Sequence, residues 1–236
     1  MRQKPTLFFV IALLTSGLSR ADVISELTGR AESGEVIAQL ELAGIYAKGE
    51  GVAKDQAAAA QWILKAAEKG DVNAQIMIGQ RYLRGEGVMK NPEEAVKWFL
   101  KAAESGNAEA QIALGGVYLS GKGVKRNGQE AAKWFAMAAE QGNPAAQCQM
   151  ARMHMSGAGV PKDDLEAYRW AGLAAKQGDR EATGVINYLK QKMTPAQLAI
   201  LQKRSRDKAD DKMIDDAIPL PSEMPESLPT ELPVEP

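Results

Sequence analysis

The chain offers almost no cysteine or histidine for covalent or metal chemistry. Its 236 residues include one cysteine, Cys148, and one histidine, His154. These two cannot complete a disulfide within the chain or a four-ligand zinc site, and any nucleophile–base pair would depend on His154 alone. Because Cys148 takes the place of Leu or Ile in the repeat described below, we expect a buried thiol. The sequence therefore predicts no catalytic residue, no metal site and no cofactor.

Other patterns could bind ligands, but each has a simpler explanation. Four Gly-x-Gly-Val loops do not continue as G-x-G-x-x-G or G-K-[ST], so we expect turns with positive φ rather than phosphate cradles. The acidic run 207–216 lacks the glycine and the final glutamate of a calcium loop. Four tryptophans could stack on sugars, but their helical spacing favours a role in core packing. None of these patterns indicates an enzyme.

A 36-residue period organises the chain between residues 35 and 178. The recurring positions are Trp62, Trp98, Trp134 and Trp170; Gln39, Gln75, Gln111 and Gln147; and the glycine pairs that begin at Gly49, Gly85, Gly121 and Gly157. Four full units follow without insertion at 35–70, 71–106, 107–142 and 143–178. Residues 22–34 match the end of a unit and form a half repeat, and 179–206 are expected to form capping helices. A fixed period of this length is typical of a solenoid.

Each unit is predicted to contain two short helices, which we call helix A and helix B. Apolar residues at 3.6-residue spacing over 38–46 predict helix A, and the glycine pair ends it. Glu94, Glu130 and Glu166 follow the caps of helix B by three residues, as in a capping box. The predicted N-caps are Asp55, Asn91, Asn127 and Asp163 for helix B, and Asp71, Asn107, Asn143 and Asp179 for helix A. The expected fold is all-α, a right-handed α/α solenoid of helix-turn-helix repeats.

The repeat pattern resembles that of a known family. The motif A-x-A-Q-x-x-L-G-x-x-Y-x-x-G-x-G-V-x-x-D-x-x-x-A-x-x-W-x-x-K-A-A-E-x-G is best represented by 71–106 and 107–142. It is similar to the Sel-one-like repeat, a relative of the tetratricopeptide repeat, and the resemblance covers roughly residues 22–190. The resemblance implies an α/α superhelix that serves as an adaptor or scaffold for other proteins, and it implies no catalytic residues.

The two ends of the chain differ in composition from the repeats. Residues 1–21 read as a secretory signal, with Arg2 and Lys4 before an apolar run and with Ser19 and Ala21 at positions −3 and −1 of a cleavage site. We therefore expect a periplasmic or secreted bacterial protein. Residues 207–236 are proline-rich and carry nine acidic against two basic residues, a net charge of −7. This composition predicts a disordered tail that acts as a solubilising tether or docks transiently on the solenoid.

One face of helix A does not repeat, although the core positions do. The face comprises positions 41, 44, 45 and 48 and their equivalents, which are neighbours by i, i+3 and i+4 spacing. Surface drift would give the same pattern; the functional interpretation is a concave binding surface, in which Arg and Met are common. The candidate partner-binding residues are Met77, Gln80, Arg81, Arg84, Gln149, Arg152 and Met153.

These observations favour an exported, non-catalytic scaffold that binds another protein or an extended peptide through its concave helix A surface. A net charge of −1 lacks the basic excess of a nucleic-acid-binding protein. After signal cleavage we expect no stable membrane span. Two alternatives stay open: a cell-envelope enzyme of the β-lactamase type, and a module that binds peptidoglycan or another cell-wall glycan.

Overall fold

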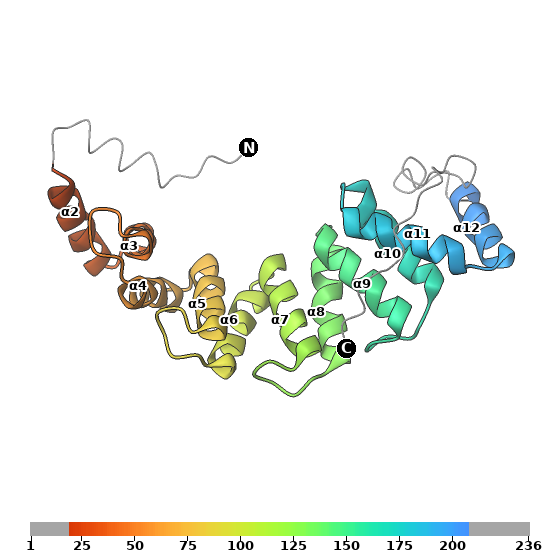
Figure 1. Cartoon of the computed structure of the whole chain (residues 1–236), viewed down its shortest axis with the longest axis horizontal. Helices are drawn as coiled ribbons and strands as arrows, with labels where there is room; N and C mark the ends of the chain where they lie inside the picture. Colours follow the sequence, from red (N-terminus) through yellow and green to blue (C-terminus); the bar gives the residue numbers. More distant parts are fainter. Residues whose placement is uncertain (1–18, 208–236) are drawn as a thin grey trace.

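The computed structural model describes residues 19–207, and this part of the chain folds into a curved row of paired helices (Figure 1). Every helix in it has 13 residues. The helices are α2 (Arg20–Glu32), α3 (Val36–Lys48), α4 (Gln56–Glu68), α5 (Val72–Arg84), α6 (Pro92–Glu104), α7 (Ala108–Ser120), α8 (Gly128–Glu140), α9 (Pro144–Ser156), α10 (Asp164–Lys176), α11 (Arg180–Lys192) and α12 (Pro195–Asp207). Odd-numbered helices from α3 to α11 are helix A, and even-numbered helices from α2 to α10 are helix B. The predicted all-α solenoid is confirmed.

The N-caps explain why the helices begin where they do. Asp55 accepts hydrogen bonds from the backbone N–H groups of Ala57 and Ala58 at 2.8 and 2.9 Å. Asn107 accepts one from Ala110 at 3.0 Å. All eight predicted caps are confirmed, and each satisfies an N–H group that has no partner within its helix.

The predicted capping boxes at helix B do not form. The Glu94 carboxylate accepts a hydrogen bond from Lys97 at 2.5 Å, and Glu130 and Glu166 bind Lys133 and Arg169 in the same way. The reason lies in the backbone: the N–H of the cap residue Asn91 already donates to the carbonyl of Tyr82 at 2.9 Å. The same bond recurs in every unit, so the glutamate is left to pair along its own helix.

Paired glycines form the turn between helix A and helix B, and the two have different roles. Gly85 ends α5 in the left-handed conformation, with φ of 75°. Gly87 lies against the preceding unit: a Cβ at this position would come within 1.8 Å of the carbonyl oxygen of Gln56, the first residue of α4. The second glycine therefore lets each loop nest against the start of the previous helix B, which couples neighbouring units.

Inside a unit, helix A and helix B meet through a small residue and a large one. A Cβ at Gly79 would lie 2.8 Å from the ring of Phe99, and one at Gly115 would lie 2.9 Å from the ring of Phe135. Both phenylalanines are almost fully buried. In the first unit the equivalent pair is Ala43 with Ile63, and in the fourth it is Ala151 with Ala171. The two glycines thus face the largest partners, and the alanines of the first and fourth units face smaller ones.

The tryptophans contribute to the same core but are less deeply buried. Trp98 and Trp170 are buried, whereas Trp62 and Trp134 keep part of their surface in solvent. A cation covers the ring in three of the four units, as with the Lys65 ammonium, which lies 3.9 Å from the ring centroid of Trp62. The ring faces are therefore packed against apolar or cationic side chains, which agrees with the predicted packing role.

The glutamine series ties each helix A to the helix before it. The side-chain N–H of Gln111 donates to the carbonyl of Ala103 near the end of α6, at 3.3 Å. The same bond is made in all four units, and the accepting carbonyl in each also accepts the backbone N–H of the glycine three residues later. The Gln111 side-chain oxygen accepts in turn from Gln141 at 2.8 Å. This polar ladder explains why a buried amide recurs every 36 residues.

The first helix begins inside the segment that we predicted to be a signal. Ser19 caps α2 in a reciprocal capping box with Asp22. The side chain of Arg20 packs over Gly51, in the place that Gln56 takes against Gly87. Residues 19–21 thus form part of the helical structure, whereas residues 1–18 and the tail 208–236 lie outside the described part of the chain.

Within residues 19–207, no helix combines the length and hydropathy that a membrane span requires. At the other end, Leu198 and Leu201 of α12 pack against the cluster formed by α8 to α11. This contact covers part of the last apolar surface, although Ile200 of α12 stays 42% exposed.

Candidate functional site

The structure places most of the candidate residues on the surface of two helices A. Met77, Gln80 and Arg84 are exposed on α5, and Met77 keeps 40% of its surface in solvent. On α9, Arg152 is exposed and Gln149 is partly exposed. Between these helices, α7 presents only small or partly buried residues on the corresponding face, such as Ala113 and Gly116. The candidate surface therefore has polar side chains on α5 and on α9, separated by α7, which carries only small or partly buried residues on this face.

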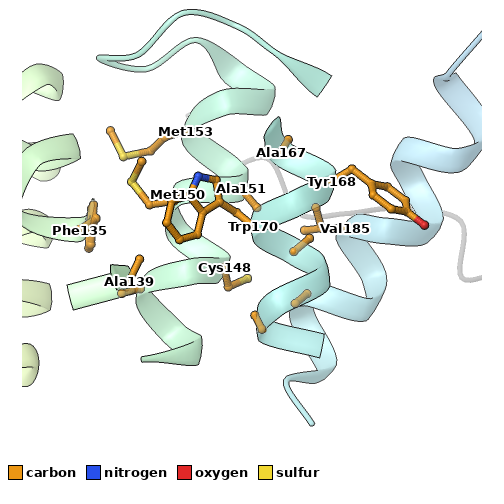
Figure 2. Close-up of a cluster of buried hydrophobic side chains, with 14 of the residues drawn as sticks. Phe135, Ala139, Cys148, Met150, Ala151, Met153, Ala167, Tyr168, Trp170 and Val185 are labelled. Carbon is orange, nitrogen blue, oxygen red and sulfur yellow. The ribbon is translucent and has the colours of Figure 1, made fainter. Parts of the chain in front are cut away.

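Met153 is not a surface residue, and its assignment to the binding face was wrong. It is 2% exposed and packs with Met150, Ala151 and Trp170 in the C-terminal core cluster (Figure 2). Three of the four equivalent positions are buried, because helix A contacts helix B on both sides. The buried part of helix A is therefore wider than the repeat pattern alone indicated.

Arg81 occupies the same core position as Met153 and is half-buried. One guanidinium nitrogen donates to the Gln56 side-chain oxygen and to the Glu86 carbonyl, both at 3.1 Å. Desolvation lowers the pKa of Arg81. These bonds join α5 to the start of α4, so Arg81 links the first two units rather than extending freely toward a partner.

The remaining cations of the candidate surface already have partners. The guanidinium of Arg84 lies 3.6 Å from the carboxylate of Glu86, and that of Arg152 lies 3.0 Å from the carboxylate of Glu181 on α11. Both pairs are solvent-exposed, so each contributes little to stability and is weakened by salt. A ligand could displace either carboxylate, and the surface offers a mixture of apolar, amide and guanidinium contacts.

The reactive side chains considered at the outset take no part in this surface. Cys148 is 2% exposed, and burial raises the pKa of its thiol to about 11. The structure thus confirms the expected buried thiol, which carries almost no thiolate at neutral pH. The Nδ1 atom of His154 lies 3.2 Å from the carbonyl oxygen of Pro161. Among the described residues, no three His, Cys, Asp or Glu side chains gather where they could hold a metal ion.

Polar groups at the junction of the half repeat and the first unit were missed from the sequence. Arg30 of α2 replaces an alanine that is fully buried in the other units, and its guanidinium donates to Glu35 at 2.7 and 2.5 Å. Glu35 consequently makes no side-chain cap bond at the start of α3. Nearby, Glu41 is 7% exposed, and one of its carboxylate oxygens has no hydrogen-bond partner among the described residues. The signal available in the sequence was an arginine, Arg30, at a position that is alanine in the other units.

Together these features define a helical-repeat solenoid with a repeating core and a non-repeating exposed face on helix A. Four consecutive matches to the Sel1 repeat cover residues 36–71, 72–107, 108–143 and 144–179. The chain belongs to the Sel1 repeat family, as its resemblance to the Sel-one-like repeats indicated. Proteins of this family are generally non-catalytic helical scaffolds and typically bind other proteins.

Two solved structures illustrate the similarity. The chain is 40% identical to c5321, a protective antigen present in uropathogenic Escherichia coli strains that displays an SLR fold, with a TM-score of 0.68. That match covers 72% of this chain and 36% of the antigen, so this chain spans about a third of its length. It is 35% identical to a Sel1 repeat protein from Oxalobacter formigenes, with a TM-score of 0.67 and coverage of 76% and 73%. No curated protein matches the chain.

Proposed function

We propose that this protein is an exported, non-catalytic scaffold that binds another protein or an extended peptide across the exposed face of its helices A. One observation carries the proposal: core positions repeat from unit to unit, whereas exposed positions on helix A do not. Exposed positions that differ from unit to unit let a solenoid surface recognise one partner. The typical role of the family supports the same class of function.

The contact surface that we propose is smaller than the one expected from the sequence. It comprises Met77, Gln80 and Arg84 on α5, and Gln149 and Arg152 on α9. Met77 supplies an exposed apolar anchor, while Arg84 and Arg152 can exchange their carboxylate partners for those of a ligand. Arg81 supports this surface from beneath through its bonds to α4 and the loop.

Site-specific photo-crosslinking tests the proposed surface. A photoreactive residue placed at Gln80 or Gln149 on helix A should capture the same partner in cells. The matched controls are Gln61 on α4 and Gln129 on α8, which are exposed glutamines on helix B. Arg84→Ala together with Arg152→Ala should weaken binding of the captured partner to purified protein by about tenfold or more, in line with the loss of two interface arginines. Equal capture from all four positions would contradict a helix A binding face.

Export is the second element of the proposal and rests on the composition of residues 1–21. Cleavage after Ala21 would remove the Ser19 cap and the Arg20 side chain that packs over Gly51. The mature protein would then begin within the first turn of α2, and the remaining turns would still bury Val23 and Leu27. The intact mass of the protein isolated from the cell envelope tests this point. A mass that includes residues 1–21 would contradict export through a cleaved signal.

A further inference from the structure

The loops between helix A and helix B lie along one edge of the solenoid. Figure 1 shows those that follow α5, α7 and α9 on the same side of the row. Each one nests against the previous unit: a Cβ at Gly123 would lie within 2.5 Å of the Pro92 backbone, and one at Gly159 within 2.1 Å of the Gly128 backbone. Each loop therefore lies next to the residue that follows the preceding loop, and the loops succeed one another along this edge.

Cations accumulate on this edge around its central loop. We call this surface the basic edge, and it consists of Lys90, Lys122, Lys125, Arg126 and Lys162. All five are exposed, and none has an ion-pair partner within residues 19–207. The loop after α7 carries Lys122 at the position where the loops after α3 and α5 carry a glutamate. The N-cap residue that follows this loop is the neutral Asn127. Asp163 directly follows Lys162, and Glu93 and Asp164 are also close in sequence. None of these three carboxylates has an ion pair within residues 19–207, and they balance only part of the positive charge.

The basic edge also presents an apolar side chain. Met89 is 89% exposed and directly precedes Lys90. The equivalent positions hold Ala53, Lys125 and Pro161, so the repeat does not require a large apolar group here. A methionine among lysines suits a ligand that alternates apolar and acidic side chains.

We infer that the basic edge binds the acidic C-terminal segment of this same chain, residues 207–236. The segment has a net charge of −7, and its glutamates alternate with Ile, Leu, Met and Val. Its length is sufficient: α12 ends at Asp207, and the 29 residues beyond it can extend about 95 Å, whereas packed helices lie only about 10 Å apart. This surface differs from the proposed helix A binding face, so the two can be tested separately.

The charges decide between the two surfaces on which the segment could dock. On the helix A face, Arg84 and Arg152 already pair with Glu86 and Glu181, and Arg81 is bound to Gln56. The segment would have to displace those partners there, whereas the cations of the basic edge are unpaired. Each new exposed pair is weak, but a tether places the segment at an effective concentration in the millimolar range. Docking is therefore expected at low ionic strength and should be lost as salt screens the charges.

Zero-length carbodiimide cross-linking of the full chain tests this inference, with peptide mapping by mass spectrometry. At about 20 mM salt, the glutamates of the segment should cross-link mainly to Lys90, Lys122, Lys125 and Lys162. At about 500 mM salt these cross-links should fall at least fivefold. They should occur within one chain, at a yield that does not depend on protein concentration.

Charge reversal gives the decisive comparison. Lys122→Glu, Lys125→Glu and Arg126→Glu together should abolish the remaining cross-links to Lys90 and Lys162. The control is Lys69→Glu, Lys176→Glu and Arg180→Glu, which changes the net charge equally on the opposite edge and should leave the cross-links in place. Circular dichroism checks that both variants stay folded. Cross-links spread evenly over all surface lysines, cross-links between chains, or cross-links unaffected by reversal of the basic edge would each overturn the inference.

Discussion

Glu41 is the buried acidic residue for which the first unit has no obvious structural need. Its equivalents are Met77, Ala113 and Gln149, none of which carries a charge. Burial raises the pKa of Glu41, while the nearby guanidinium of Arg30 opposes the rise and the carboxylate of Glu35 adds to it. The ionised side chain is therefore less favourable in the folded chain than in the unfolded one.

We expect Glu41→Gln to stabilise the protein at neutral pH. Because the folded pKa of Glu41 is raised, its contribution to stability is greatest below the unfolded pKa and is lost as pH rises through the folded pKa. The substitution removes that loss, so thermal unfolding at pH 7 should shift upward by about 1–3 °C. The gain should shrink as pH falls toward 4, because the carboxyl group becomes increasingly protonated in both states.

Glu35→Gln is the control, because the sign of its pKa shift is opposite. The hydrogen bonds from Arg30 lower the pKa of Glu35, so its stabilising effect is present above the unfolded pKa and disappears as pH falls through the folded pKa. The melting temperature of this variant should be lower than that of the wild type at pH 7. Thermal unfolding followed by circular dichroism from pH 4 to 8 distinguishes the two residues. A lower melting temperature for Glu41→Gln at pH 7 would show that the carboxylate is needed where it lies.

The glutamine ladder predicts a stabilising substitution at Lys69. Gln111 and Gln147 accept from the glutamine thirty residues later, whereas the side-chain oxygen of Gln39 has no partner in the described part of the chain. Lys69→Gln would place the same donor at the end of α4 and should add about 0.5–1.5 kcal/mol to the free energy of unfolding.

The reverse change, Gln141→Ala, should remove the donor to Gln111 and reduce the free energy of unfolding by about 1–3 kcal/mol. Urea titration measures both variants, and Lys69→Ala controls for loss of the lysine itself. If Lys69→Gln were no more stable than Lys69→Ala, the ladder would not extend to the first unit.

The structure shows which residues the sequence could predict and which it could not. N-caps such as Asp55 were predictable because their bonds reach only two or three residues along the chain. Met153 was misplaced because helical spacing defines a face but does not tell how many neighbours cover it. The glutamines of the ladder recur every 36 residues in the sequence. Their hydrogen bonds join separate helices, however, so these bonds could be identified only from the structure. Local signals determined the elements, whereas contacts between units determined the candidate site.

At the scale of the element, the sizes of the facing core residues determine how helix A packs against helix B. Gly79 and Gly115 face Phe99 and Phe135, whereas alanine faces a smaller partner in the first and fourth units. The paired positions lie twenty residues apart in sequence. In the second and third units, the phenylalanine ring fills the space that the glycine leaves between helix A and helix B.

Gly115→Ala tests this packing against a neighbouring glycine in the same helix. The added methyl group would meet the Phe135 ring, and we expect a net loss of about 1–3 kcal/mol in spite of the better helix propensity of alanine. Gly116→Ala has no atom within 4 Å of its new Cβ and should gain about 0.5–1 kcal/mol. Urea titration gives both values.

A second substitution in the Gly115→Ala background identifies the cause of the loss. Phe135→Leu should recover part of the stability, because the smaller side chain leaves room for the methyl group. A double-mutant cycle then gives a coupling between positions 115 and 135 that no pair of independent sites would show. Purely additive effects would mean that the clash is relieved elsewhere in the unit.

At the scale of the whole molecule, stability depends on the contacts between units. Each unit contacts only its neighbours, so the solenoid unfolds as one cooperative body only while every interface is intact. The second glycine of each loop lies at such an interface. Gly159 joins the fourth unit to the third, since its Cβ position overlaps the Gly128 backbone, which cannot move aside as a side chain could.

Gly159→Ala should therefore uncouple the fourth unit from the first three. The control is Gly157→Ala in the same loop. Both glycines have a positive φ, of 79° and 77°, so both substitutions cost about 1–2 kcal/mol of backbone strain. At Gly157, however, the nearest atom to the new Cβ is the Cβ of Lys162 at 3.5 Å, within the same loop.

Urea unfolding should stay a single transition for Gly157→Ala and become two transitions for Gly159→Ala. In hydrogen exchange, residues 143–201 of Gly159→Ala should lose protection before residues 35–142. A single transition with uniform loss of protection in both variants would mean that α8, α9 and α10 hold the interface without the loop.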